Sequence, residues 1–226
     1  MFSTFKRMAA AVLAAASTTA TMAQGYFDVV TMECRENRDG REYKASVDFP
    51  VGGSDAVMRA AKQWIGDILE LDGVEEATAD GFRTALDTAA KTWQDEVQGG
   101  NRTVNITWLY EDPSCVTFES VVSDRDSIPW TTSDIATFSK RDGHRITAQE
   151  TFRCDERQIK RLMWQSRGTL PMEVSNADAL YVGDVGFIDG WVIVIGPARN
   201  TSGAEFRIRY SDAEQWLNEG REGYVP

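Results

Sequence analysis

The sequence contains very little histidine and cysteine, the residues on which many catalytic and metal sites depend. His144 is the single histidine among 226 residues, and the three cysteines form no CxxC pair. A histidine-based triad or zinc site needs further partners. The GxSxG and GxGxxG patterns of nucleophile elbows and phosphate loops are also absent. We therefore identify no catalytic residue, expect His144 to be an exposed loop residue, and expect no metal site and no cofactor.

Long apolar runs are also missing, except near the N-terminus. Residues 8–16 read MAAAVLAAA, preceded by Lys6 and Arg7 and followed by Thr21 and Ala23 at the −3 and −1 positions of a cleavage site. This combination is typical of a secretory signal peptide, here residues 1–23. Its apolar run is shorter than the roughly 20 residues that span a bilayer. We expect residues 24–226 to have no membrane span and to be periplasmic or secreted.

Positive charge is scarce relative to negative charge. The chain has 24 basic and 35 acidic residues and a formal net charge of −11. Two of the basic residues belong to the predicted leader, so the predicted mature chain is more acidic still. Such a charge repels phosphate backbones and argues against nucleic-acid binding. It would attract a basic protein partner, although charge that only keeps an exported protein in solution explains it equally well.

The cysteines allow one disulfide with one thiol left over. An exported protein folds in an oxidising compartment, where disulfides form and persist. The sequence predicts a disulfide among Cys34, Cys115 and Cys154, and it leaves all three pairings open.

The first half of the chain predicts a hairpin, two helices and two more strands. Strand-like residues 26–34 and 43–49 flank an Asp-Gly turn within 37–40. Apolar residues then recur at helical spacing through 57–68, with Ser54 as a candidate N-cap, and through 82–97. Alternating patterns indicate strands at 104–110 and 116–122, followed by a looser segment, 124–133.

The second half predicts a further mixture of strands and helices. Expected strands cover 135–138, 179–183, 186–195 and 206–210. Asp155 is a candidate N-cap for a helix that includes residues 159–164, and Ser211 for a final helix. Tight turns between successive strands favour antiparallel pairing, so the expected class is α+β, with mostly antiparallel sheets packed by about four helices. We expect residues 24–226 to form a single domain, with a possible subdivision near 100.

This order of elements resembles a known family, the extracytoplasmic C-terminal domain of the RsiV anti-sigma factor and of the PdaC peptidoglycan deacetylase. The resemblance is spread over the strand 47–50, the helix around Trp64, the paired strands 104–110 and 116–122, and the segments 136–147, 180–188 and 203–212. The family often carries a Gly-Gly-Ala-His element after the second strand of the central pair. Residues 124–133 contain no such element, so no role tied to it transfers to this chain.

The resemblance implies a secreted sensing or wall-associated domain. In RsiV the related domain binds lysozyme, and in PdaC catalysis belongs to a separate deacetylase domain that this sequence does not contain. For this chain the resemblance implies recognition of a basic protein such as a lysozyme-like enzyme, or of peptidoglycan fragments.

Trp130 is the most informative single residue for binding. It follows Pro129 in a segment without periodicity, near Asp124 and Asp126. An aromatic residue beside charges in a loop can anchor a protein or a sugar, whereas packing on a sheet edge is the ordinary alternative. Trp130, Asp124 and Asp126 are therefore the candidate binding residues.

Three functions follow from these observations. The preferred one is an exported non-catalytic binding domain of the bacterial envelope. The first alternative is a small carboxylate-dependent hydrolase, which would require two acids converging in a cleft with Trp130. The second alternative is a structural envelope protein that assembles with itself.

Overall fold

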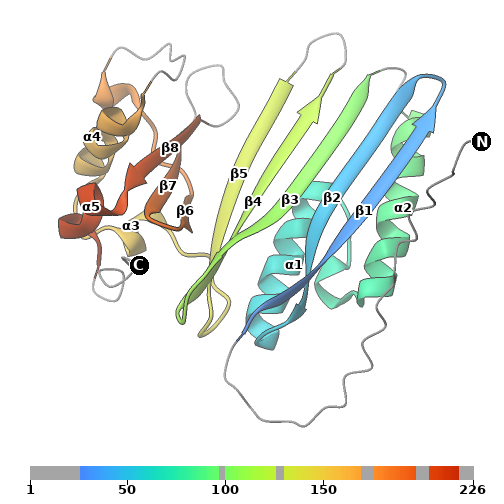
Figure 1. Ribbon diagram of the computed structural model, residues 1–226, viewed down its shortest axis with the longest axis horizontal. Helices are drawn as coiled ribbons and strands as arrows, with labels where there is room; N and C mark the ends of the chain where they lie inside the picture. The colour runs from blue at the N-terminus through green and yellow to red at the C-terminus, as the bar shows by residue number, and fades with distance from the viewer. Residues whose placement is uncertain (1–25, 97–99, 126–129, 169–175, 197–203, 219–226) are drawn as a thin grey trace, which may run out of the picture.

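The fold comprises two antiparallel-rich sheets with helices, in a computed structural model that describes residues 26–96, 100–125, 130–168, 176–196 and 204–218. A five-stranded sheet has the order β1-β2-β3-β4-β5, and a three-stranded sheet has the order β6-β7-β8. The two sheets lie beside each other, with α1 and α2 covering one face of the larger sheet (Figure 1). The expected α+β class is confirmed.

The hairpin at the start of the larger sheet forms where the sequence predicts it. Its strands are β1 (Asp28–Arg38) and β2 (Arg41–Gly52). Asp39 and Gly40 between them both have positive φ, 54° and 79°, as a two-residue type I′ turn requires. Met32 and Cys34 of β1 point into the core, while Glu33 between them faces outward.

Two helices carry the chain from β2 to β3. Ser54 accepts a hydrogen bond from the Val57 amide and caps α1 (Asp55–Leu69) as predicted, and α2 (Ala79–Glu96) follows a short 3₁₀ turn, Val74–Glu76. Because this helical connection returns the chain to the same end of the sheet, β2 and β3 pair in parallel. The predicted subdivision near residue 100 falls between these two paired strands.

The remaining strands of the larger sheet are antiparallel: β3 (Asn101–Glu111), β4 (Cys115–Asp124) and β5 (Trp130–Ser139). The expectation of an irregular segment over 124–133 needs correction, since Trp130 to Ser133 continue β5 and pair with β4. Thr131, Thr132 and Ser133 lack the strong apolar alternation that marks a strand, but hydrogen bonding to β4 holds them extended.

The smaller sheet is preceded and followed by helices. The elements are α3 (Ala148–Thr151), α4 (Glu156–Ser166), a 3₁₀ turn (Ala177–Ala179), β6 (Val185–Ile188), β7 (Trp191–Gly196), β8 (Ala204–Arg209), α5 (Tyr210–Ala213) and a last 3₁₀ turn (Glu214–Trp216). The Asp155 cap is confirmed. Residues 179–183 form no strand, because Leu180 ends a 3₁₀ turn and the ladder begins only at Val185. The final helix begins at Tyr210 without a side-chain cap from Ser211.

Two main hydrophobic cores result, one between the larger sheet and α1 and α2, the other around α4 and the smaller sheet. The two sheets meet where β6 crosses β4 and β5. Thr137 donates its hydroxyl to the Val185 carbonyl at 2.9 Å, and the Phe187 amide donates to the Thr117 hydroxyl at 3.3 Å. A third small cluster around Ile135 and Ile193 fills this junction.

The described parts of the chain include no helix that is both long enough and apolar enough to cross a membrane.

Candidate functional site

The predicted binding residues Trp130 and Asp124 lie directly opposite each other across β4 and β5. The same row continues across the sheet, since Asp124 is opposite Arg102 of β3 and Arg102 is opposite Tyr43 of β2. Opposite residues of a sheet point to the same face, here the face covered by α1 and α2. Trp130 is 43% exposed at the edge strand. Asp126 lies outside the described residues.

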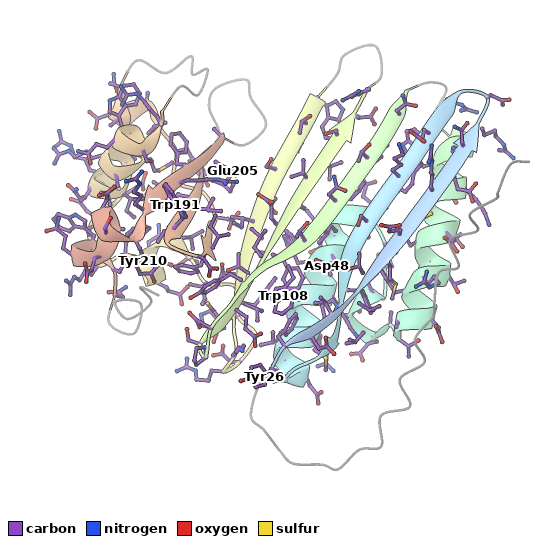
Figure 2. The ribbon with its side chains drawn as sticks, in the orientation of Figure 1. Tyr26, Asp48, Trp108, Trp191, Glu205 and Tyr210 are labelled. Carbon is purple, nitrogen blue, oxygen red and sulfur yellow. The ribbon has the colours of Figure 1, made fainter. Side chains whose placement is uncertain are left out.

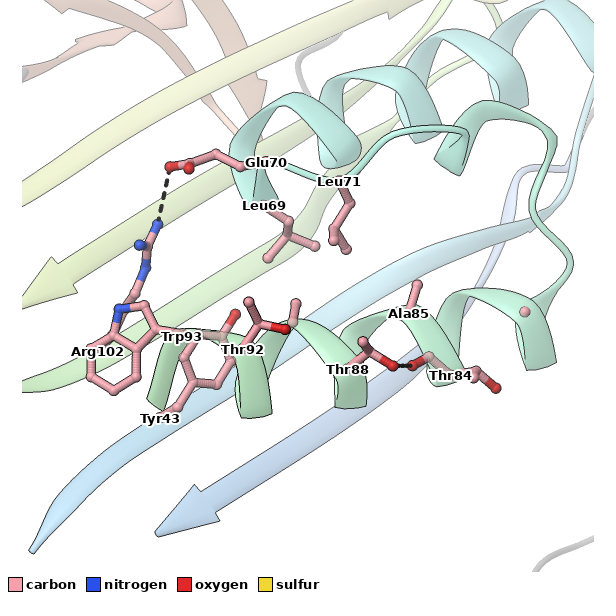
Figure 3. Close-up of a pocket in the computed structure, with 12 residues that line it drawn as sticks. Tyr43, Leu69, Glu70, Leu71, Thr84, Ala85, Thr88, Thr92, Trp93 and Arg102 are labelled. Carbon is pink, nitrogen blue, oxygen red and sulfur yellow. Dashed lines mark hydrogen bonds and ion pairs between the residues drawn. The ribbon is translucent and has the colours of Figure 1, made fainter. Parts of the chain in front are cut away.

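A groove of about 530 Å³ opens beside this row, between α2 and the end of α1. We call it the α2 groove, and its walls are Tyr43, Leu69, Glu70, Leu71, Gly81, Thr84, Ala85, Thr88, Ala89, Thr92, Trp93 and Arg102. Figure 3 shows Arg102 extending toward Glu70 at one end, near Trp93 and Tyr43. The volume lies within the range of small-molecule sites, about 300–1,000 Å³.

Local sequence explains why the groove is open. Residues of α2 spaced three and four apart alternate between glycine, alanine and threonine on this face, and these side chains are too short to reach α1. Tyr43 and Trp93 close the floor at one end, with ring centroids 5.7 Å apart. The result is an apolar trough with hydroxyl groups along one wall.

Two buried polar atoms lack partners, one on Arg102 at the end of the groove and one on Asp124, its opposite residue in β4. The Nε of Arg102 and the Oδ1 of Asp124 are buried and have no hydrogen-bond partner among the described residues. Arg102 also makes a loose ion pair with Glu70, 3.7 Å between Nη2 and Oε1. Buried polar groups are nearly always satisfied, so a free donor and a free acceptor in neighbouring strands mark a place where a ligand would gain hydrogen bonds.

A second group of ionisable side chains lies on the other face of β4. Glu119 lies close to Glu205 of β8, and Arg207 contacts Glu205 at 3.0 Å. Burial raises the pKa of Glu119 to about 7, and the neighbouring Glu205 carboxyl group adds to the shift. Glu205 is labelled in Figure 2. These two acids converge, but the sheet separates them from Trp130, because Glu119 is opposite Ile135 and Trp130 belongs to the alternate face.

His144 is exposed, as predicted, and both of its ring nitrogens are engaged. Nδ1 lies 2.6 Å from Asp142 Oδ1, and Nε2 lies 3.0 Å from Glu150 Oε1. The hydrogen bond with Asp142 raises the pKa of His144. Glu150 also completes a capping box with Thr147 at the start of α3. A histidine held between two carboxylates stabilises this turn and leaves no free nitrogen to act as a base toward a cysteine.

The expected disulfide is absent, because Cys34, Cys115 and Cys154 are all free thiols. Cys34 belongs to the core under α2, whereas Cys115 and Cys154 belong to the core of the smaller sheet. Burial raises the pKa of Cys34 to about 12 and also raises that of Cys154, so neither is an activated thiolate. The described residues hold no cluster of three or more metal-ligating side chains.

Sequence reasoning missed Arg102 and the groove itself. Arg102 is one of many arginines, and it follows a glycine pair at the start of a strand, with no local pattern that marks it. The unpaired Nε of Arg102 can be recognised only in the folded sheet, where β3 lies between β2, which carries Tyr43, and β4, which carries Asp124. The small residues of α2 could have been found as a stripe at helical spacing, but such a stripe equally indicates close helix packing.

Comparison with solved structures places the fold. A DUF3298 family protein from Bacteroides fragilis matches with a TM-score of 0.60 and 10% identity, covering 89% of this chain and 98% of that one. A DUF3298 family protein from Pseudomonas aeruginosa matches with a TM-score of 0.53 and 10% identity, covering 87% and 96%. No known family model and no curated protein sequence matches the chain. The chain therefore shares the fold of DUF3298 proteins.

Proposed function

We propose that this chain is an exported, non-catalytic binding domain that takes up a glycan fragment of the bacterial envelope in the α2 groove. The observation that carries the proposal is the free donor of Arg102, which lines the end of an apolar groove, with the free acceptor of Asp124 opposite it in β4. The groove's volume suits a small ligand.

The pairing of donor and acceptor favours a neutral amide over an anion. An amide carbonyl can accept from Arg102 Nε while the amide N–H donates to Asp124 Oδ1, which satisfies both atoms at once. The N-acetyl groups of peptidoglycan sugars are such amides. A bare carboxylate would satisfy Arg102 but would be repelled by Asp124 and Glu70, in a chain whose net charge is already strongly negative.

The other walls fit the same ligand class. The threonine hydroxyls of α2 can bond sugar hydroxyls, and apolar surface can cover the faces of sugar rings. Trp130 lies two strands from Arg102 in the same row, about 10 Å away at normal strand spacing. It is placed to stack on the next sugar of an oligomer.

Titration calorimetry with N-acetylated probes tests this proposal. We expect soluble muropeptides and chitotetraose to bind the purified protein. Trp130→Ala and Arg102→Met should each weaken binding by about tenfold, the cost of losing one anchor. Tyr181→Ala is the matched control, since Tyr181 is 60% exposed but does not line the groove, and it should bind as the wild type does.

The competing partner, a basic protein, has its own signature. Lysozyme binding that weakens with salt but is unchanged in Arg102→Met would indicate that the acidic surface as a whole, and not the α2 groove, binds the partner. Sugar binding that is equal in the wild type and both groove variants would refute the α2 groove as the site.

A further inference from the structure

The outer edge of β1 is the longest strand edge that the described residues leave without a backbone partner. β1 has 11 residues and forms one end of the larger sheet, and β2 is the one strand of the described residues that pairs with it (Figure 1). Its side chains on the face away from α2 are exposed from Thr31 to Asn37, at every second position. A long edge with free N–H and C=O groups is a template for pairing with another strand.

The other edges of the two sheets are treated differently. Along β5, the Ile146 amide donates to the Thr137 carbonyl and the Ser139 amide donates to the His144 carbonyl, so the following segment covers the 137–139 end of that edge. Along β6, the backbone of Val185 and Phe187 bonds the threonines of the larger sheet. Only six residues form the edge strand β8. β1 therefore differs from them in both length and exposure.

The turn determines which backbone groups of β1 face outward. In a two-residue hairpin the flanking residues, here Arg38 and Arg41, exchange both hydrogen bonds. Bonding then alternates, so even-numbered residues bond β2 and odd-numbered residues direct their N–H and C=O away from the sheet. The outward set between residues 31 and 37 is Thr31, Glu33, Arg35 and Asn37.

Charge selects one register for two antiparallel copies of this edge. If Glu33 faces Arg35 of the second copy, then Arg35 also faces Glu33 of the second copy, and Thr31 faces Asn37. The two neighbouring registers that still pair the outward-bonding residues with one another place Glu33 opposite Glu33 or Arg35 opposite Arg35. Opposite charges directly across a sheet stabilise the pair and like charges destabilise it. Glu33 has no ion pair among the described residues, and Arg35 reaches Glu42 with one nitrogen while its side chain stays 67% exposed.

The helical layer permits the same arrangement. α2 contacts both β1 and β2 and lies along the β1 side of the larger sheet (Figure 1). With strands about 4.8 Å apart, an α2 axis midway between β1 and β2 would lie about 10 Å from its mate across a two-fold axis beside β1, which is close to the normal distance between packed helices. The flank of α2 beyond β1 carries exposed Arg83, Asp87 and Lys91, of mixed sign. This flank presents no block of like charge.

We propose that two copies of this chain associate through β1, antiparallel and about a two-fold axis at Cys34, to form a continuous ten-stranded sheet with all four long helices on one face. The partner is a second copy because the edge is complementary to itself in one register. Association does not depend on the glycan site, since the α2 groove opens on the opposite flank of α2 from β1.

Sedimentation velocity at physiological salt, from low micromolar to hundreds of micromolar protein, tests the proposal. We expect a monomer–dimer equilibrium. In Glu33→Arg, two arginines lie opposite each other at two symmetric positions of the dimer, which should raise the dissociation constant about tenfold. Combining Glu33→Arg with Arg35→Glu should restore the opposite-charge pairs and the affinity. Asp72→Arg makes the same charge change in an exposed loop and should leave the dimer unchanged.

Glu33→Pro tests backbone pairing at the β1 edge independently of the side-chain charges. Its missing N–H is one that faces outward, so the ladder with β2 is retained, and the dimer should weaken by at least tenfold because two intermolecular hydrogen bonds are lost. Unchanged circular dichroism and melting temperature establish that this variant folds.

Hydrogen exchange of single amides tests the register in which the two β1 strands pair. In the dimer the amides of Thr31, Glu33 and Arg35 should become protected as concentration rises, while those of Met32 and Cys34 are protected at every concentration. A monomer throughout the range would overturn the proposal. A dimer insensitive to Glu33→Pro and Glu33→Arg, or outward amides already protected at the lowest concentration, would overturn it equally.

Discussion

Glu119 shows how the fold changes the chemistry of one side chain. In the sequence it is one of 35 acids and carries no distinguishing pattern. The folded chain half-buries it against Glu205, and both effects penalise its charged form. The negative charge of Glu205 adds to the effect of burial in raising the pKa of Glu119. Arg207 offsets part of this repulsion through its contact with Glu205.

This pair predicts a pH-dependent stability with a defined sign. A folded-state pKa of about 7, above the ordinary 4.5, means that the folded chain binds more protons than the unfolded chain between those values. Stability therefore falls as pH rises from about 4.5 to about 7. Glu119→Gln removes the penalty and should stabilise the protein at pH 8 by about 1–2 kcal/mol, since solvent screens the half-exposed pair.

Urea unfolding at pH 5 and pH 8 measures the effect. Glu205→Gln should reproduce only part of it, because the burial of Glu119, the larger cause of its raised pKa, remains. A Glu119→Gln stabilisation of the same size at both pH values would be inconsistent with the raised pKa.

At the scale of secondary-structure elements, the position of β6 depends on Gly186, which has no side chain. A Cβ on Gly186 would lie 2.0 Å from Ile135 Cδ1 and 3.0 Å from Thr117 Cγ2. The glycine allows the smaller sheet to approach β4 and β5 closely enough for the Thr137 and Phe187 hydrogen bonds. The sequence indicates a glycine in a strand at this point, for which close backbone approach is one explanation.

Gly186→Ala should therefore cost about 2–3 kcal/mol, because Ile135 is fully buried and cannot move aside without strain. Gly190→Ala is the control: its φ of 75° is unfavourable for alanine, but nothing lies within 4 Å, so the expected cost is about 1 kcal/mol. Chemical denaturation measures both. Adding Ile135→Ala to Gly186→Ala should cost less than the sum of the two single changes; strict additivity would argue against the contact.

For the whole molecule, Arg145 joins the two sheets. Its Nη2 lies 3.2 Å from Asp134 of β5 and 3.1 Å from Asp184, the residue before β6. Asp134 also accepts from the Trp64 indole of α1 at 3.1 Å. One guanidinium thus links α1, β5 and the start of the smaller sheet. Burial raises the pKa of Asp184, and Arg145 opposes that shift.

Arg145→Met should destabilise the protein by about 1–2 kcal/mol at pH 7, because two close carboxylates lose their shared cation while remaining partly exposed. The loss should shrink on acidification, because the raised pKa of Asp184 makes it take up a proton before an ordinary aspartate does. Arg141→Met is the control, since Arg141 is 84% exposed and its side chain contacts Asp142 alone among the ion pairs described; it should change stability by less than ~0.5 kcal/mol. Equal losses from both variants would exclude a special role for Arg145.

Several features were predictable from the sequence because they depend on neighbours along the chain. The hairpin turn at Asp39-Gly40, the caps of α1 and α4, and the buried faces of the helices all follow from local conformational preference and periodicity. Trp130 and Asp124 were identifiable for the same reason, as an aromatic residue and a charge close together in a segment without apolar periodicity. Their position in a strand was not, because cross-strand bonding holds Thr131 to Ser133 extended.

Only the tertiary structure decided which distant residues share a surface. The parallel pairing of β2 with β3 brings Tyr43 beside Arg102, and the antiparallel ladder brings Arg102 beside Asp124. Tertiary packing also separates Cys34 from the other cysteines and brings Glu119 close to Glu205. Strand order and the meeting of two sheets are set by the total apolar surface removed from water, a sum over the whole chain that no local pattern contains.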